Sequence, residues 1–331
     1  MTATGTTRRS LDEAREAVAS LFTQAGASPA NAASVAWALV MAEADGLKGH
    51  GLSRVPTYLA MLKSGKLDGQ AVPIESRPRP GVLAIDACHG FAYPAIDLAL
   101  IELPGMAREQ GVVAAPIRRS SHCGAAGLHV ERLARQGLVA LLFANTPAAI
   151  APWGGARPVF GTNPIAFAAP LPGREPLVID MALSKVARGP IVAAKQKGAA
   201  IPEGWALDAA GKPTTDPEAA LAGTMVPLGD AKGATLAMMV EILAASLVGA
   251  HFAFEASSFL DDKGGPPDTG QFILAIDPAS MGGQWFDERM RLLAHAIEDQ
   301  EGARLPGMRR LALREKARAE GIEVPDALLV G

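Results

Sequence analysis

Apolar positions near the start of the chain recur with the three-to-four-residue spacing of amphipathic helices. A helix is predicted over residues 10–23, because Ser10 and Glu13 have the spacing of a capping box and an apolar face follows them. Pro29 suits the first position of a second helix, and a third is expected over 53–64. The N-terminal region is therefore predicted to be a helical unit.

Further along, short apolar runs alternate with helical segments. Strands are predicted at 81–86, 112–117, 138–144, 165–169, 177–180 and 272–276. Helices are expected over 94–109, which Pro104 should kink or break, and over 125–135. Residues 198–230 are mostly turns, and charged amphipathic helices follow to the C-terminus. This order predicts an α/β or α+β fold, with helical ends around a sheet-containing middle.

The most apolar stretch, 234–250, is shorter than the roughly 20 residues that span a bilayer. Glu241 lies in its middle, so we interpret it as a buried core helix. The formal net charge of −3 offers no general attraction for nucleic acid or anionic membranes, and neither is expected as a partner. The N-terminus lacks the apolar core of a secretory signal, and two cysteines define no disulfide framework. A cytoplasmic location is expected.

One segment, His122 to Gly127, follows a predicted strand and precedes a helix, as a phosphate-binding turn would. It lacks the complete G-x-G-x-x-G fingerprint of a Rossmann domain, so that fold is not predicted. Two interpretations remain: an anion-holding turn, or a plain glycine-bearing connection. Its histidine and cysteine match neither the ligand spacing of a zinc site nor a convergent nucleophile and base, so no metal is expected.

His50 and Arg54 lie four residues apart where a helix begins. An arginine can hold a carboxylate through two hydrogen bonds, and a nearby imidazole can donate a proton. The alternative is an ordinary surface pair. Two other features also stay open: the arginines around 304–310 suit a phosphate or a solvated helix face, and Asp180 suits a ribose hydroxyl or a turn.

Taken in order, several segments resemble the malate/L-lactate dehydrogenase family of non-Rossmann NAD(P)-dependent oxidoreductases. They are HGLSR (50–54), SSHCGAAG (120–127), APWGG (151–155), GTNPIAFAAP (161–170), IPEGWALD with GKPTTDP (201–217), PLGDAKG (227–233) and RLPGMRR (304–310). VIDMALSKVARG (178–189) is most similar to the Δ1-piperideine-2-carboxylate/Δ1-pyrroline-2-carboxylate reductases within that family.

The resemblance implies a homodimer with a largely antiparallel cofactor-binding sheet in residues 71–284. Residues 1–70 and 285–331 would form a helical region for substrate binding and dimerisation. NADPH would be the hydride donor, with NADH as an alternative, and a small cyclic imine carboxylate would be reduced to L-pipecolate or L-proline.

The resemblance also implies roles for single residues. His50 matches the proton donor, and Arg54, Thr162, Arg188 and Gly189 match substrate contacts. The matching cofactor-binding residues are His122, Cys123, Gly124, Ala125, Ala126, Asp180, Met181, Ala182, Lys232, Arg304, Leu305, Pro306, Gly307, Met308, Arg309 and Arg310.

Two positions depart from the family pattern. Gly49 stands where the family has a serine that relays charge to the histidine, so a water or Lys48 would have to replace that hydroxyl. Pro190 stands where a lysine is common. Two alternatives to the imine reductase follow: a 2-hydroxy acid dehydrogenase of the malate, lactate or ureidoglycolate type, and a dinucleotide-binding protein that has lost catalysis.

Overall fold

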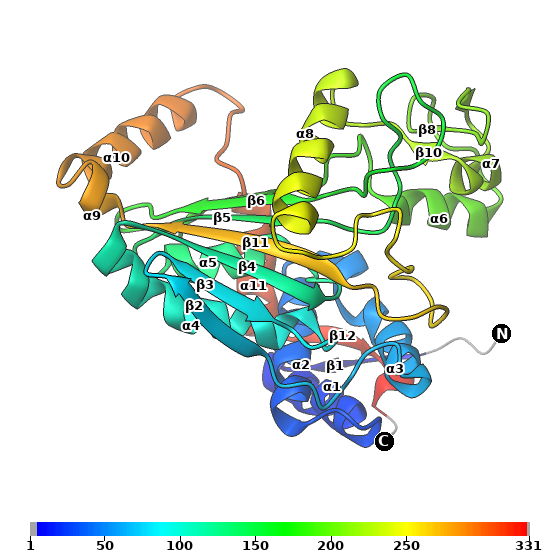
Figure 1. Cartoon of the computed structure of the whole chain (residues 1–331), viewed down its shortest axis with the longest axis horizontal. Helices are drawn as coiled ribbons and strands as arrows, with labels where there is room; N and C mark the ends of the chain where they lie inside the picture. Colours follow the sequence, from blue (N-terminus) through cyan, green and yellow to red (C-terminus); the bar gives the residue numbers. More distant parts are fainter. Residues whose placement is uncertain (1–4, 330–331) are drawn as a thin grey trace.

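The computed structural model describes residues 5–329 and is built around a seven-stranded sheet (Figure 1). In spatial order its strands are β2 (Ile74–Arg79), β3 (Val82–Asp86), β4 (Val112–Ser120), β11 (Thr269–Ile276), β5 (Val139–Ala144), β6 (Ile165–Ala169) and β7 (Leu177–Met181). All neighbours pair antiparallel except β3 and β4. The expected largely antiparallel sheet is confirmed, and β11 lies between β4 and β5, which contain the strands predicted at 112–117 and 138–144.

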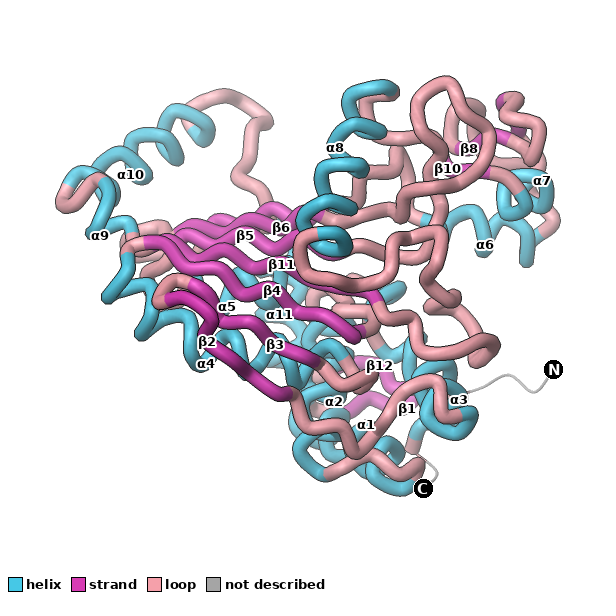
Figure 2. The backbone as a smooth tube through the Cα atoms, viewed as in Figure 1, coloured by secondary structure: helices cyan, strands magenta, loops and turns pink. Residues whose placement is uncertain are grey.

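Helices cover both faces of this sheet (Figure 2). On one face, α4 (Ala92–Gln110) and α5 (Ala126–Ala134) bury their apolar sides against the central strands. On the other, α8 (Ala231–Glu241) packs on Phe143 and Phe272 and continues into a π-helical turn (Ile242–Ser246). Burial of these apolar faces is the main source of stability for such layers.

The helical N-terminal unit forms as predicted. It contains α1 (Leu11–Gln24), α2 (Pro29–Ala44) and α3 (Val55–Ser64). The capping box of Ser10 and Glu13 is present, and Pro29 begins α2. The C-terminal helix α11 (Met308–Glu320) packs on α2, while β12 (Ile322–Pro325) pairs with β1 (Thr6–Arg9). Both ends of the chain thus complete one helical unit below the sheet in Figure 1.

Two smaller groups of elements stand apart from the sheet in Figure 1. The first contains α6 (Arg188–Lys197), α7 (Pro217–Ala222) and the short strands β8 (Ala206–Leu207), β9 (Pro213–Thr214) and β10 (Thr224–Met225). The second contains α9 (Pro278–Met281) and α10 (Trp285–Glu298). Helix α10 packs through Ala294 on Leu171 and Leu305. The division into a 1–70 plus 285–331 region and a 71–284 region stays a prediction.

Two helix predictions need correction. Pro104 does not break α4, because the helix is buried through Leu100, Leu103 and Ala107 and this packing offsets one lost backbone hydrogen bond. The 234–250 helix is buried on one face only. Apolar side chains on its other face are exposed: Leu236, Met238, Met239, Ile242 and Leu247. Over residues 5–329, no helix is long and apolar enough to cross a membrane.

A buried network of charged groups joins three of these helices. Asp45 follows α2, Glu131 lies on α5, and Arg310 and Arg314 lie on α11. Arg314 bonds both Asp45 oxygens at 2.6 Å and Glu131 at 2.6 and 2.9 Å. Arg310 pairs with both carboxylates as well. Although burial opposes the charge, these guanidinium groups lower the pKa of Glu131 to about 2.

We expect Arg314→Met to lower the free energy of unfolding by about 3–5 kcal/mol, because it leaves the buried Asp45 with Arg310 alone and Glu131 with Arg310 and the partly exposed Arg135. Urea denaturation measures this loss. The matched control is Arg174→Met, which removes an exposed pair with Glu298 and should cost less than about 1 kcal/mol. Equal losses in the two variants would contradict the central role of the buried network.

Candidate functional site

Two 3-10 turns between α2 and α3, Lys48–His50 and Leu52–Arg54, carry the predicted proton donor and carboxylate ligand. The buried carboxylate of Glu43 holds them, since Leu52 N–H donates to Glu43 Oε2 at 3.0 Å. A side chain at Gly51 would overlap that same oxygen, so glycine is required there. Glu43, near the end of α2, was not identified from the sequence, because no motif distinguishes it from other acidic residues on helices.

Gly49 gives His50 no hydroxyl, and Lys48 does not replace it. The ammonium of Lys48 pairs with Glu43 Oε1. His50 Nδ1 is buried and has no hydrogen-bond partner among the described residues. The expectation that Lys48 takes over the serine's role is therefore wrong. The space beside the Gly49 Cα is open, so a serine side chain would fit.

His122 lies beside His50, with ring centroids 5.4 Å apart and rings nearly parallel. Its Nδ1 is 2.6 Å from the hydroxyl of Tyr58 on α3. The Tyr58 hydroxyl is in turn 3.1 Å from that of Tyr93 on α4. The ring of Phe259 packs on His122 at 5.1 Å. These contacts fix the imidazole of His122, and none of the three aromatic residues had a recognisable signal in the sequence.

Both imidazoles are neutral at pH 7. Burial, and then the charge of Arg54, lower the pKa of His50 to about 4. The pKa of His122 is shifted well below its ordinary value by burial, by Arg54 and by His50. Both rings keep some water-accessible surface, but protein atoms surround them on most sides. A bound carboxylate would offset the Arg54 charge and raise the pKa of His50 towards neutrality.

Arg54 is free to bind an anion. Its Nε donates to the Gly49 carbonyl at 2.7 Å, and Nη1 donates to the Phe259 carbonyl at 3.4 Å. Within residues 5–329 it pairs with no carboxylate, so guanidinium hydrogens remain for a substrate carboxylate. Arg54, His50 and His122 therefore form a site with one cation, two neutral imidazoles and an aromatic wall from Phe259.

The segment His122 to Ala126 lies next to this site, and its role in cofactor binding stays a prediction, although the start of the helix that follows it is already occupied. Helix α5 begins at Ala126, and its early amide at Gly127 donates to Asp180 Oδ2 at 2.7 Å. A carboxylate from β7 thus occupies this helix start, where it would repel a phosphate. Asp180 caps a helix, which the sequence could not show.

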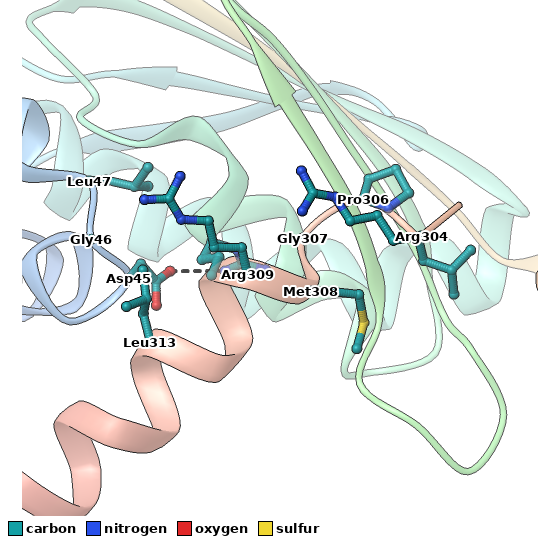
Figure 3. A pocket seen from close by; sticks show the side chains of 11 residues that line it. Asp45, Gly46, Leu47, Arg304, Pro306, Gly307, Met308, Arg309 and Leu313 are labelled. Atoms are coloured by element: carbon teal, nitrogen blue, oxygen red, sulfur yellow. Dashed lines mark hydrogen bonds and ion pairs between the residues drawn. The ribbon is translucent and has the colours of Figure 1, made fainter. Parts of the chain in front are cut away.

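A cavity of about 410 Å³ lies beside the turn that carries His50 (Figure 3). Its lining residues are Asp45, Gly46, Leu47, Leu313 and the whole segment Arg304 to Arg310. Arg310 is held in the buried network, whereas Arg304 and Arg309 are exposed and make no ion pair in the described part of the chain. Gly307, with φ of 88°, immediately precedes α11 here. Free guanidinium groups at a helix start suit a phosphate, so the cavity fits part of a dinucleotide.

The remaining predicted residues lie on other elements. Thr162 is held by its N–H to Thr146 Oγ1 at 2.9 Å. Arg188 and Gly189 begin α6. Lys232 is exposed near the start of α8. At the end of β7, Met181 is exposed, and the next residue, Ala182, is half-buried. No hydrogen bond or ion pair joins any of them to His50 or Arg54 within residues 5–329. Their roles stay predictions.

Comparison with known proteins identifies the family. A family model for malate/L-lactate dehydrogenase matches residues 10–330. The chain belongs to the malate/L-lactate dehydrogenase family. It is therefore an NAD(P)-dependent oxidoreductase, as the sequence segments predicted.

Three relatives illustrate the range of this family. The (2R)-3-sulfolactate dehydrogenase (NADP(+)) of Chromohalobacter salexigens is 52% identical, over 97% of this chain and 95% of its own. A Δ1-pyrroline-2-carboxylate/Δ1-piperideine-2-carboxylate reductase of Pseudomonas putida is 41% identical, over 96% of this chain and 94% of its own. The crystal structure of Δ1-piperideine-2-carboxylate reductase from Pseudomonas syringae superposes with a TM-score of 0.93, at 39% identity and 98% coverage of both chains.

The low pKa of His50 predicts a pH dependence of stability. Its pKa is about 4 in the folded protein and about 6.5 in the unfolded chain, which binds more protons between these values. Stability should therefore fall as the pH drops from 7 to 5. His50→Asn should reduce this fall by on the order of 1 kcal/mol in urea denaturation. His295→Asn, at an exposed position, is the control; an identical fall in all three proteins would disprove the assignment.

Proposed function

We propose that the protein is an NADPH-dependent reductase of small 2-imino carboxylates such as Δ1-piperideine-2-carboxylate and Δ1-pyrroline-2-carboxylate. A bound nicotinamide supplies the hydride. Arg54 holds the substrate carboxylate, His50 manages the proton, and Phe259 limits access of water. The unpaired Arg304 and Arg309 at the cavity favour the phosphorylated dinucleotide NADPH over NADH.

The observation that carries this choice of substrate is that His50 is neutral and has no neighbouring serine hydroxyl to relay charge to it. His50 has a pKa of about 4, and Gly49 provides no hydroxyl to assist it. Reduction of a carbonyl requires an acid to protonate the developing alkoxide. The nitrogen of a cyclic imine is a much stronger base than a ketone oxygen. It can therefore take a proton from His50, once a bound carboxylate has raised the pKa of His50, before the hydride is transferred. Hydride transfer to the resulting iminium leaves a neutral amine. The site is thus better suited to an imine than to a ketone.

A second candidate is the reduction of 3-sulfopyruvate to 3-sulfolactate. It is favoured by the 52% identity to the (2R)-3-sulfolactate dehydrogenase (NADP(+)). Such a substrate has two acidic groups and needs a second cation. Arg188 is half-buried and makes no ion pair within residues 5–329, so its guanidinium group is free for a sulfonate.

We also propose that the active form is a homodimer. Helices α8 and α10 rise from the same side of the sheet in Figure 1. Both expose large apolar side chains, including Ile242 at 54% and Trp285 at 61%. Exposed apolar surfaces of this kind mark contacts with other molecules, and a second copy of the chain would cover them.

The loss of NADPH absorbance tests the function directly. We expect turnover of Δ1-piperideine-2-carboxylate to exceed that of sulfopyruvate, pyruvate and oxaloacetate. His50→Ala should lower kcat by on the order of 10²-fold or more, because it removes the proton-transfer group. His295→Ala is the matched control. Turnover of sulfopyruvate alone would assign the second candidate, and dinucleotide binding without any turnover would indicate that catalysis has been lost.

Arg188→Gln distinguishes the two substrate classes. If the guanidinium group of Arg188 binds a second acidic group, the KM for sulfopyruvate should rise by on the order of tenfold or more, since a charged hydrogen bond is lost. The KM for the cyclic imine, which has one carboxylate, should change by less than about threefold. Lys185→Gln, at an exposed position three residues earlier, is the control. Equal increases for both substrates would rule out this role of Arg188.

A further inference from the structure

Lys66 is a buried cation just beyond the end of α3, after the left-handed Gly65. Its side chain is 0% exposed. The ammonium donates to three backbone carbonyls, those of Ser258 at 2.7 Å, Asp261 at 3.1 Å and Lys263 at 2.7 Å. An ammonium group has three N–H donors, so all of them are used on one loop.

A cation at this position has a cost that an apolar residue would avoid. Removing an ammonium group from water is unfavourable unless its charge and hydrogen bonds are satisfied. The nearest carboxylate oxygen, Asp261 Oδ1, is 3.8 Å away on a side chain that is 44% exposed. The three carbonyls therefore provide most of the compensation. What Lys66 adds over an apolar side chain is a fixed conformation of residues 258–263.

That loop also forms part of the candidate active site. Phe259 is buried, its carbonyl accepts a hydrogen bond from Arg54, and its ring covers His122. Arg54 immediately precedes α3, and Lys66 lies just beyond its other end. The loop is thus held at both ends of α3, by Arg54 before the helix and by Lys66 after it.

We propose that Lys66 is a positioning residue, which fixes residues 258–263 so that Phe259 orients Arg54 and covers His122. The inference rests on the proposed role of Arg54 at the substrate. Lys66 itself forms no hydrogen bond with Arg54 or His122 among the described residues, so it acts through the loop.

Lys66→Met tests this role in the full-length enzyme, because methionine fills the space but donates no hydrogen bond. With the substrate that the wild type turns over, kcat/KM should fall by on the order of tenfold to a hundredfold, chiefly through KM for the carboxylate substrate. KM for NADPH should change by less than about twofold. Lys63→Met, an exposed lysine on the same helix, should leave both constants unchanged.

A double-mutant cycle separates positioning from a general loss of packing. If Lys66 acts through the Phe259 loop, Lys66→Met and Phe259→Ala should not be additive, and the double variant should resemble the more impaired single variant. Additive effects on kcat/KM would overturn the proposal. Should Lys66→Met fail to fold, Lys66→Gln, which retains two N–H donors, should show an intermediate loss in the same cycle.

Two readouts need no substrate and stay decisive if the proposed function fails. In Lys66→Met, amide hydrogen exchange should accelerate in residues 257–263 but not in the central sheet. By NMR, the pKa of His122 should rise towards its ordinary value as the Phe259 cover loosens. Unchanged exchange and an unchanged His122 titration would show that Lys66 does not position the loop, whatever the substrate is.

Discussion

The structure depends on one buried cluster of charges, Asp45 and Glu131 with Arg310 and Arg314. It joins α2, α5 and α11, which come from the N-terminal part, the middle and the C-terminal part of the chain. Burial of four charged groups is stable only because each carboxylate meets both guanidinium groups. The turn with His50 follows Asp45 directly, and the Arg304–Arg310 segment precedes Arg314. The same cluster that closes the fold therefore also positions residues that line the cavity proposed for part of the dinucleotide.

Electrostatic balance decides what the neighbouring site can do. Arg310 and Arg314 are neutralised by their partners, whereas Arg54 meets only backbone carbonyls. Its uncompensated charge attracts a carboxylate, and it adds to the effect of burial in keeping the two stacked imidazoles neutral. Substrate binding and proton affinity are thereby coupled, because an anion on Arg54 removes the main charge that opposes protonation of His50.

Much of the fold was readable from local patterns. The capping box at Ser10, Pro29 at a helix start and the run over 165–169 all have short-range physical causes, and the structure bears them out. Pro104 shows where such rules fail, since the tertiary packing of α4 outweighs a local helix breaker. In the site, the segments of family resemblance identified His50 and Arg54. The capping of α5 by Asp180 joins residues 53 positions apart on different elements, and no spacing in the sequence encodes it.

The sequence by itself determined the family, the class of reaction and the order of the main helices and most central strands, because these depend on local propensity and on contiguous motifs. Only the tertiary structure decided which charges are neutralised and which stay free. Arg304, Arg309 and Arg310 look alike in the sequence, yet burial beside Asp45 and Glu131 commits only the last to the fold. Lys66 likewise becomes informative only when residues nearly 200 positions away surround it. The reason is physical: the state of an ionisable group is set by its solvent and its partners, and both are fixed by long-range packing.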